Sequence, residues 1–242
     1  MPKTDAEWRQ DMYKRLDEIK NKYYSDKYND VRAVREFDIS VDQYFDTFWK
    51  DNAPLGTTYY DTKNDDISKI HETDWDSTKK DEKIYTCVCA IHGVPMLYST
   101  RIVETIEKIQ HSADVSVVTV EVKTLDTPIS SFYYYKTAWI VVGNKQKNFS
   151  VYQRLMKVEL SDYNPFKDLI IRKTLEGLVE NEAIWFKGAV DAGYMVTRPE
   201  FVVKETADDK PLEGNEKIEA EKKVENVVDS KTEEHLPVIE KS

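Results

Sequence analysis

The stretch from residue 164 to residue 185, NPFKDLIIRKTLEGLVENEAIW, decides the fold of this chain. Pro165 has no backbone N–H and therefore suits the first turn of a helix. Apolar residues then recur at three- and four-residue steps, namely Phe166, Leu169, Ile170, Leu175, Leu178, Ile184 and Trp185. The pattern predicts a helix to about residue 188, with Gly177 as a weak point or a close-packing site.

The segment before this helix, residues 67–160, has a different periodicity. Polar and apolar residues alternate, and short polar or Gly/Pro links separate the runs, which indicates β-strands. Parallel strands need crossover connections of a dozen or more residues, so these short links predict an antiparallel meander. The six expected strands cover residues 67–75, 83–92, 97–111, 115–125, 132–142 and 149–160.

Further elements precede the meander. We expect a short strand at residues 31–39 and, after Ser40 as the N-cap, an amphipathic helix. Thr4 and Glu7 form a capping-box pattern that predicts another amphipathic helix over residues 5–24. The charges of this N-terminal helix balance, so docking on the domain or on a partner is favoured over a membrane-surface role.

A strand, a helix, six antiparallel strands and a long terminal helix follow the order of a helix-grip fold. We therefore predict an α+β fold: a curled antiparallel sheet of about seven strands closed by a long C-terminal helix, with an additional N-terminal amphipathic helix. One helix laid across a curled sheet leaves a cavity unless large side chains crowd inward. The alternative is that aromatic and Met side chains, from Tyr133 to Met156, fill that space.

The 242-residue chain divides into three predicted parts. Residues 1–30 form the N-terminal helix and a linker, residues 31–193 form one helix-grip domain, and residues 194–242 form a linker and a disordered acidic tail. Residues 204–242 hold 12 acidic, 7 basic and no aromatic side chains. Such a composition cannot offset the entropy lost on ordering.

Charge and cysteine content narrow the functional class. The formal net charge of −10 argues against a general nucleic-acid binder, which needs clustered Lys and Arg. The two cysteines, Cys87 and Cys89, fit core thiols better than a disulfide framework or a zinc site. No apolar run has the form of a signal peptide or a membrane span. We expect an intracellular, cytosolic protein, with a peripheral position at organelle membranes as an alternative.

Three segments resemble a VASt domain, a lipid-binding relative of the StAR-related transfer (StART-like) fold. They are the region around Trp75, the run FYYYKTAWIVV from Phe132 to Val142, and MKVELSDYNPFKDLIIRKTLEGLVENEAIWFKGAV from Met156 to Val190. The resemblance covers residues 31–193. It implies a sterol-sized cavity, entry beneath a mobile loop, and intracellular sterol transport or sensing.

The chain also departs from the family pattern. Members commonly carry a lipid-surface-binding module and a membrane anchor, and we identify neither in this sequence. Three possibilities follow: the protein carries lipid freely, its N-terminal helix recruits it, or it keeps only a regulatory role. If Trp139 takes the family's aromatic position, Ala138 stands where a basic residue is often found.

Strand alternation predicts which side chains face the cavity. If Trp139 faces inward, Tyr133, Tyr135 and Thr137 face inward with it. Val118 and Val120 share an apolar face, and we assign Tyr152 and Met156 inward. With residues of the 52–60 loop and of the long helix, the predicted lipid-binding set is Pro54, Leu55, Tyr59, Val118, Val120, Tyr133, Tyr135, Thr137, Trp139, Tyr152, Met156, Leu169 and Lys173.

Several of these assignments have alternatives. A sterol hydroxyl needs one or two polar partners, for which Thr137, Tyr135, Tyr152 and Arg154 are the candidates. Each tyrosine is equally well explained as a core aromatic, and a surface salt bridge is favoured for Arg154. The loop at residues 52–60 fits either a lid or an ordinary loop that one buried Leu anchors.

The sequence thus predicts noncatalytic intracellular lipid binding, with a sterol or another hydrophobic lipid as ligand and transfer between membranes as its use. It predicts no cofactor, no metal and no catalytic residue, because no Ser-His-Asp set, paired-carboxylate motif, Gly-rich phosphate loop or metal spacing is visible. One alternative is a regulatory adaptor with a filled cup that meets a protein partner through its N-terminal helix or acidic tail. The other is a helix-grip enzyme acting on a hydrophobic substrate.

Overall fold

The computed structural model describes residues 4–24, 28, 30–32, 34–57, 59, 63, 65–78, 81–92, 98–127, 133–144, 148–160 and 165–193. The predicted disordered tail lies outside these residues. The helices are α1 (Asp5–Tyr23), α2 (Val41–Phe48) and α4 (Lys167–Asp191). The strands are β1 (Asp30–Val31), β2 (Arg35–Phe37), β3 (Ile67–Glu72), β4 (Glu82–Ala90), β5 (Ser99–Ser112), β6 (Val115–Thr124), β7 (Tyr133–Gly143) and β8 (Ser150–Leu160).

The first two helices begin where their caps place them. Thr4 and Glu7 form a reciprocal capping box at α1, and Ser40 forms one with Gln43 at α2. The third helix begins later than predicted. Its N-cap is Phe166, without a side-chain cap, so Pro165 lies just before the helix and not in its first turn.

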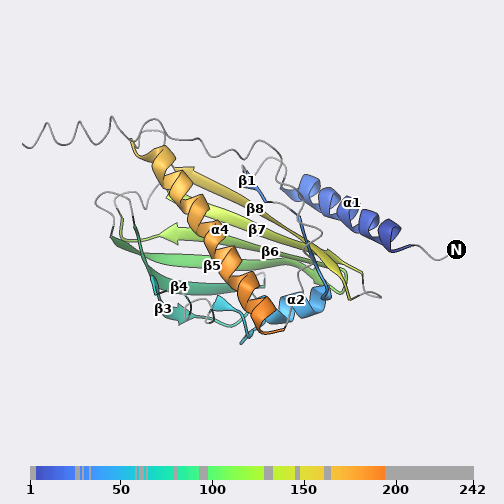
Figure 1. The fold of residues 1–242 in the computed structure, drawn as a ribbon. Helices are drawn as coiled ribbons and strands as arrows, with labels where there is room; N and C mark the ends of the chain where they lie inside the picture. The colour runs from blue at the N-terminus through green and yellow to red at the C-terminus, as the bar shows by residue number, and fades with distance from the viewer. Residues whose placement is uncertain are drawn as a thin grey trace, which may run out of the picture. The chain divides into compact units, whose positions relative to one another are not determined.

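The strands form one antiparallel sheet in the order β1-β8-β7-β6-β5-β4-β3, and β2 also pairs with β8. The sheet curls without closing and α4 crosses it (Figure 1), which confirms the predicted α+β helix-grip fold. The sheet has eight strands because the segment at residues 31–39 forms two short ones. The register shifts by one residue between the pair Val31–Leu155 and the pair Arg35–Tyr152, which separates the two short strands.

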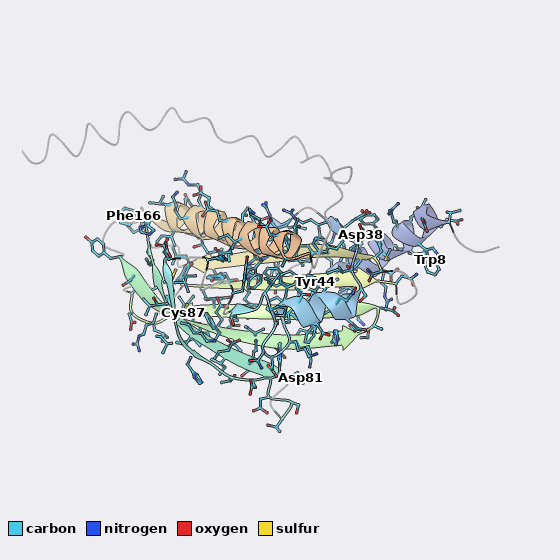
Figure 2. All side chains as sticks on the ribbon, turned by 60° about the horizontal axis from the view of Figure 1, so that its bottom comes forward. Trp8, Asp38, Tyr44, Asp81, Cys87 and Phe166 are labelled. Carbon is cyan, nitrogen blue, oxygen red and sulfur yellow. The ribbon has the colours of Figure 1, made fainter. Side chains whose placement is uncertain are left out.

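The two faces of the sheet are covered by different helices. On the concave face, α2 and α4 lie on the same side (Figure 2), and Phe48 and Phe186 join Val118, Trp139 and Tyr152 in one core. On the convex face, α1 packs against β7 and β8. Its buried Met12 and Leu16 contact a second core, which includes Val117, Ala138, Ile140 and Leu155. The N-terminal helix therefore docks on the domain.

Candidate functional site

Two adjoining cavities lie between the concave face of the sheet and α4. The inner cavity has a volume of about 100 Å³ and the outer cavity about 360 Å³. Five residues line both and mark their junction: Cys89, Ile102, Tyr135, Leu178 and Asn181. The two cavities therefore adjoin at these residues.

The outer cavity lies beneath the first half of α4. Ile170, Thr174 and Gly177 of the helix line it, together with the ends of β4, β6 and β7. Register places those strand ends at the same edge of the sheet. In Figure 2 this is the edge near Phe166, at the opposite end of the view from Trp8 of α1.

Gly177 is one reason for the open space. A Cβ atom built on Gly177 would meet no atom within 4 Å. Gly177 is therefore not a close-packing site, because it leaves the helix backbone bare where α4 borders the outer cavity. Gly177, the predicted weak point in the helix, thus borders the larger of the two cavities.

Aromatic side chains fill the other end of the cup. Trp139 lies 5.3 Å from Trp49 and 5.2 Å from Trp185, measured between ring centroids. Tyr152 lies 5.2 Å from Phe186 in the same cluster. The alternative in which large side chains crowd inward therefore holds in part beneath the C-terminal half of α4, where only the smaller cavity is left, and the larger cavity lies beneath its N-terminal half.

The inner cavity contains a buried charge. Arg154 is only 4% exposed, and its guanidinium carbon lies 4.2 Å from the centroid of the Trp139 ring. Its Nη1 donates a hydrogen bond to the Leu178 carbonyl at 2.7 Å. The favoured prediction of a surface salt bridge is wrong, because β8 pairs on both sides and α4 covers this face.

The other polar candidates are held by protein partners or remain neutral. Thr137 Oγ1 accepts a hydrogen bond from Trp139 Nε1 at 2.9 Å. The Tyr152 hydroxyl donates to Glu182 at 2.5 Å, and both side chains are buried outside the cavity lining. Burial raises the pKa of Tyr135 well above its ordinary value and that of Tyr133 to about 12. Both phenols therefore stay protonated at neutral pH.

The predicted lipid-binding residues occupy several environments. Val120, Tyr135, Thr137 and Trp139 line the inner cavity, and Tyr133, Tyr135 and Lys173 line the outer one. Val118, Tyr152 and Leu55 lie in the concave core, and Met156 is buried on the same strand face as Tyr152. Leu169 is half-buried and Pro54 is exposed, and neither lines a cavity. Lipid contact by this set stays a prediction.

The loop after α2 meets the inner cavity through Thr57. Leu55 is buried, and its N–H donates to the Thr47 carbonyl at 3.0 Å. Tyr59 lies against Gly188, close to the C-terminal end of α4. The loop is therefore docked beside the aromatic end of the cup, and Tyr60 lies outside the described residues.

Several lining residues were not among the predicted contacts. Tyr85, Cys87 and Cys89 line the inner cavity from alternate positions of β4, and Leu178 and Asn181 lie three residues apart on α4. Period-two alternation was the available signal for the first three, since Tyr85, Cys87 and Cys89 are alternate residues of the strand expected at residues 83–92. Nothing in the sequence indicated that β4 would form a cavity wall.

The described ranges contain no group of three or more His, Cys, Asp or Glu side chains that could hold a metal ion. No helix within these ranges is both long and apolar enough to cross a membrane.

A cavity between a curled sheet and its C-terminal helix can be compared with known families. The model of the VASt family, described as the VAD1 analog of StAR-related lipid transfer domain, matches residues 31–177. This chain belongs to the VASt family. The match confirms the resemblance that the sequence shows, and it supports lipid binding as the general activity of this VASt domain.

Other comparisons add less. The chain matches no curated protein sequence. Among solved structures, 15 chains match. One is the crystal structure of the Mll3558 protein from Rhizobium loti, with 12% identity and a TM-score of 0.36, covering 65% of this chain and 99% of that chain.

Proposed function

We propose that this VASt domain binds one lipid in the joined cavities, without catalysis, and carries it between membranes. The observation that carries the proposal is the space left between the sheet and the first half of α4. The outer cavity, at about 360 Å³, lies within the range of ligand pockets, roughly 300–1,000 Å³. Its junction with the inner cavity extends that space toward Trp139.

A sterol is the lipid class that the family favours. Its rigid apolar body requires a large apolar wall, which Ile102, Leu178 and Ile170 supply along the two cavities. We assign the oxygen atom of the ligand to the inner end, where Thr137 and Arg154 are among the polar groups of the lining. This division of apolar wall and polar end is what an amphipathic lipid needs.

A transfer assay tests the proposal. Donor liposomes contain dehydroergosterol and acceptor liposomes contain a dansyl lipid that accepts its fluorescence energy. We expect the full chain to accelerate sterol appearance in the acceptor liposomes well above the spontaneous rate. No acceleration, together with no lipid extracted from the chain after purification from a eukaryotic cell, would contradict the proposal.

Cys89 offers a matched pair of variants for this assay, because it lines both cavities. Cys89→Phe places a ring at their junction, and we expect it to abolish transfer. Cys89→Ser removes the thiol with little change of volume and should transfer as the wild type does. Thermal melting of both variants separates a blocked cavity from an unfolded chain.

A further inference from the structure

The inner cavity holds a positive charge that the protein satisfies only in part. Arg154 lines this cavity and carries five N–H donors on a permanently charged guanidinium. Within the described part of the chain, the Leu178 carbonyl is its one hydrogen-bond acceptor. Its Nε is buried without a partner. A charged donor group left in this state is costly unless something else pairs with it.

The acidic groups near the cavity do not form that pair. Glu182 of α4 is buried, but its carboxylate accepts from the Tyr152 hydroxyl. Glu104 of β5 lines the same cavity. Neither forms an ion pair with Arg154 among the residues that the structure describes. The Trp139 ring beneath the guanidinium offsets only part of the burial cost.

The free part of the guanidinium has a definite geometry. Nη1 is occupied by the helix carbonyl and Nε is covered by protein atoms, so a ligand in the cavity reaches the edge formed by Nε and Nη2 only after a small shift of the side chains around it. The two N–H groups on that edge are parallel and match the two oxygens of a carboxylate. The same edge of Arg101 holds Asp126 in this protein, with Nε and Nη2 at 2.6 and 2.7 Å from the two carboxylate oxygens.

We propose that Arg154 binds the carboxylate of an acidic lipid whose apolar body extends into the outer cavity. The inference rests on the proposed lipid-binding function and specifies the polar end of the ligand. A neutral hydroxyl would satisfy one donor and leave the charge unpaired, whereas a carboxylate satisfies both donors and the charge. Fatty acids and steroid acids share this chemistry.

The test compares an acid with its own ester. cis-Parinaric acid and its methyl ester are titrated into the full chain, and their fluorescence reports binding. Because charge-assisted hydrogen bonds are the strong ones, we expect the wild type to prefer the acid by about 10-fold or more. Competition by palmitic acid and by cholanic acid then distinguishes a fatty acid from a steroid acid as the source of the carboxylate.

Three variants assign the preference to its residue. In Arg154→Met we expect the acid to lose its preference, so that the acid and the ester bind equally. Arg154→Lys keeps the charge but loses the parallel edge, so its preference should be intermediate. Arg172→Met, at an exposed position on α4, is the matched control and should keep the full preference.

Each result has one meaning. No preference for the acid in the wild type overturns the inference, and this measurement does not depend on whether Arg154→Met folds. A preference that persists in folded Arg154→Met overturns it as well. If neither the acid, the ester nor dehydroergosterol binds, the proposed lipid-binding function itself fails. If only dehydroergosterol binds, the function stands and the assignment to Arg154 is wrong.

Discussion

Replacing Gly177 with leucine should close the outer cavity from the helix side. Gly177 lines this cavity, and a Cβ atom there meets nothing within 4 Å, so the new side chain enters without a clash at its base. Its four carbon atoms then take up part of the outer cavity of about 360 Å³.

The expected loss of lipid affinity follows from that overlap. A lipid excluded from contacts worth three or four methylene groups, at about 0.8 kcal/mol each, loses about 3 kcal/mol, or more than 100-fold in Kd. The helix itself should gain up to about 1 kcal/mol, because glycine is a poor helix former. Gly177→Leu should therefore melt at a higher temperature than the wild type and bind lipid far more weakly.

The assay is a fluorescence titration with dehydroergosterol and cis-parinaric acid, combined with thermal melting. Gly177→Ala is the matched control, since a methyl group should raise the melting temperature and leave binding within about twofold. Wild-type affinity in a folded Gly177→Leu would refute the assignment of the outer cavity as the lipid site.

Three further outcomes are expected. Burial alone would raise the pKa of Glu72, but hydrogen bonds from Lys69 and Lys83 lower it from 4.5 to about 2, so its stabilising effect of about 2 kcal/mol is present above pH 4.5 and is lost as the pH falls toward 2. Glu72→Gln should therefore reduce the fall of the urea-unfolding midpoint at acidic pH. An unchanged fall would show that the ion pairs contribute nothing to stability. Leu16→Ala should lower the free energy of unfolding by about 3 kcal/mol in urea titrations and leave lipid affinity unchanged, because α1 packs on the face away from the cavities. A loss of lipid affinity in the folded variant would show that the two faces of the sheet are coupled. A side chain at position 188 would overlap the Tyr59 ring, so Gly188→Val should displace the loop after α2 and speed hydrogen exchange at residues 52–57. Unchanged exchange would show that the contact between Tyr59 and Gly188 does not hold this loop.

The arrangement of elements could be predicted because each signal was local. Capping residues, alternation along the strands and short connections all act within a few residues, and they locate α1, α2 and the meander to within a few positions. The beginning of α4 was less accurate, because Pro165 suits both the first helical turn and the residue before the N-cap. The division of residues 31–39 into two strands depends on the register against β8, which no local signal encodes.

The site was harder to predict because a cavity is what packing leaves empty. Alternation around Trp139 identified one wall, including Thr137 and Tyr135, but β4 could not be recognised as the facing wall. The state of Arg154 is the clearest example. A long charged side chain is normally exposed, and only the crossing of α4 over β8 buries this one.

Native mass spectrometry of the purified full chain tests whether the two cavities hold one lipid. The chain is stripped of lipid, incubated with liposomes of mixed neutral sterols, phospholipids and fatty acids, and separated from them before measurement. We expect a complex of one chain with one lipid, which is absent in Gly177→Leu and present in Gly177→Ala. A chain that stays free of lipid, or that binds lipid equally in both variants, would contradict it.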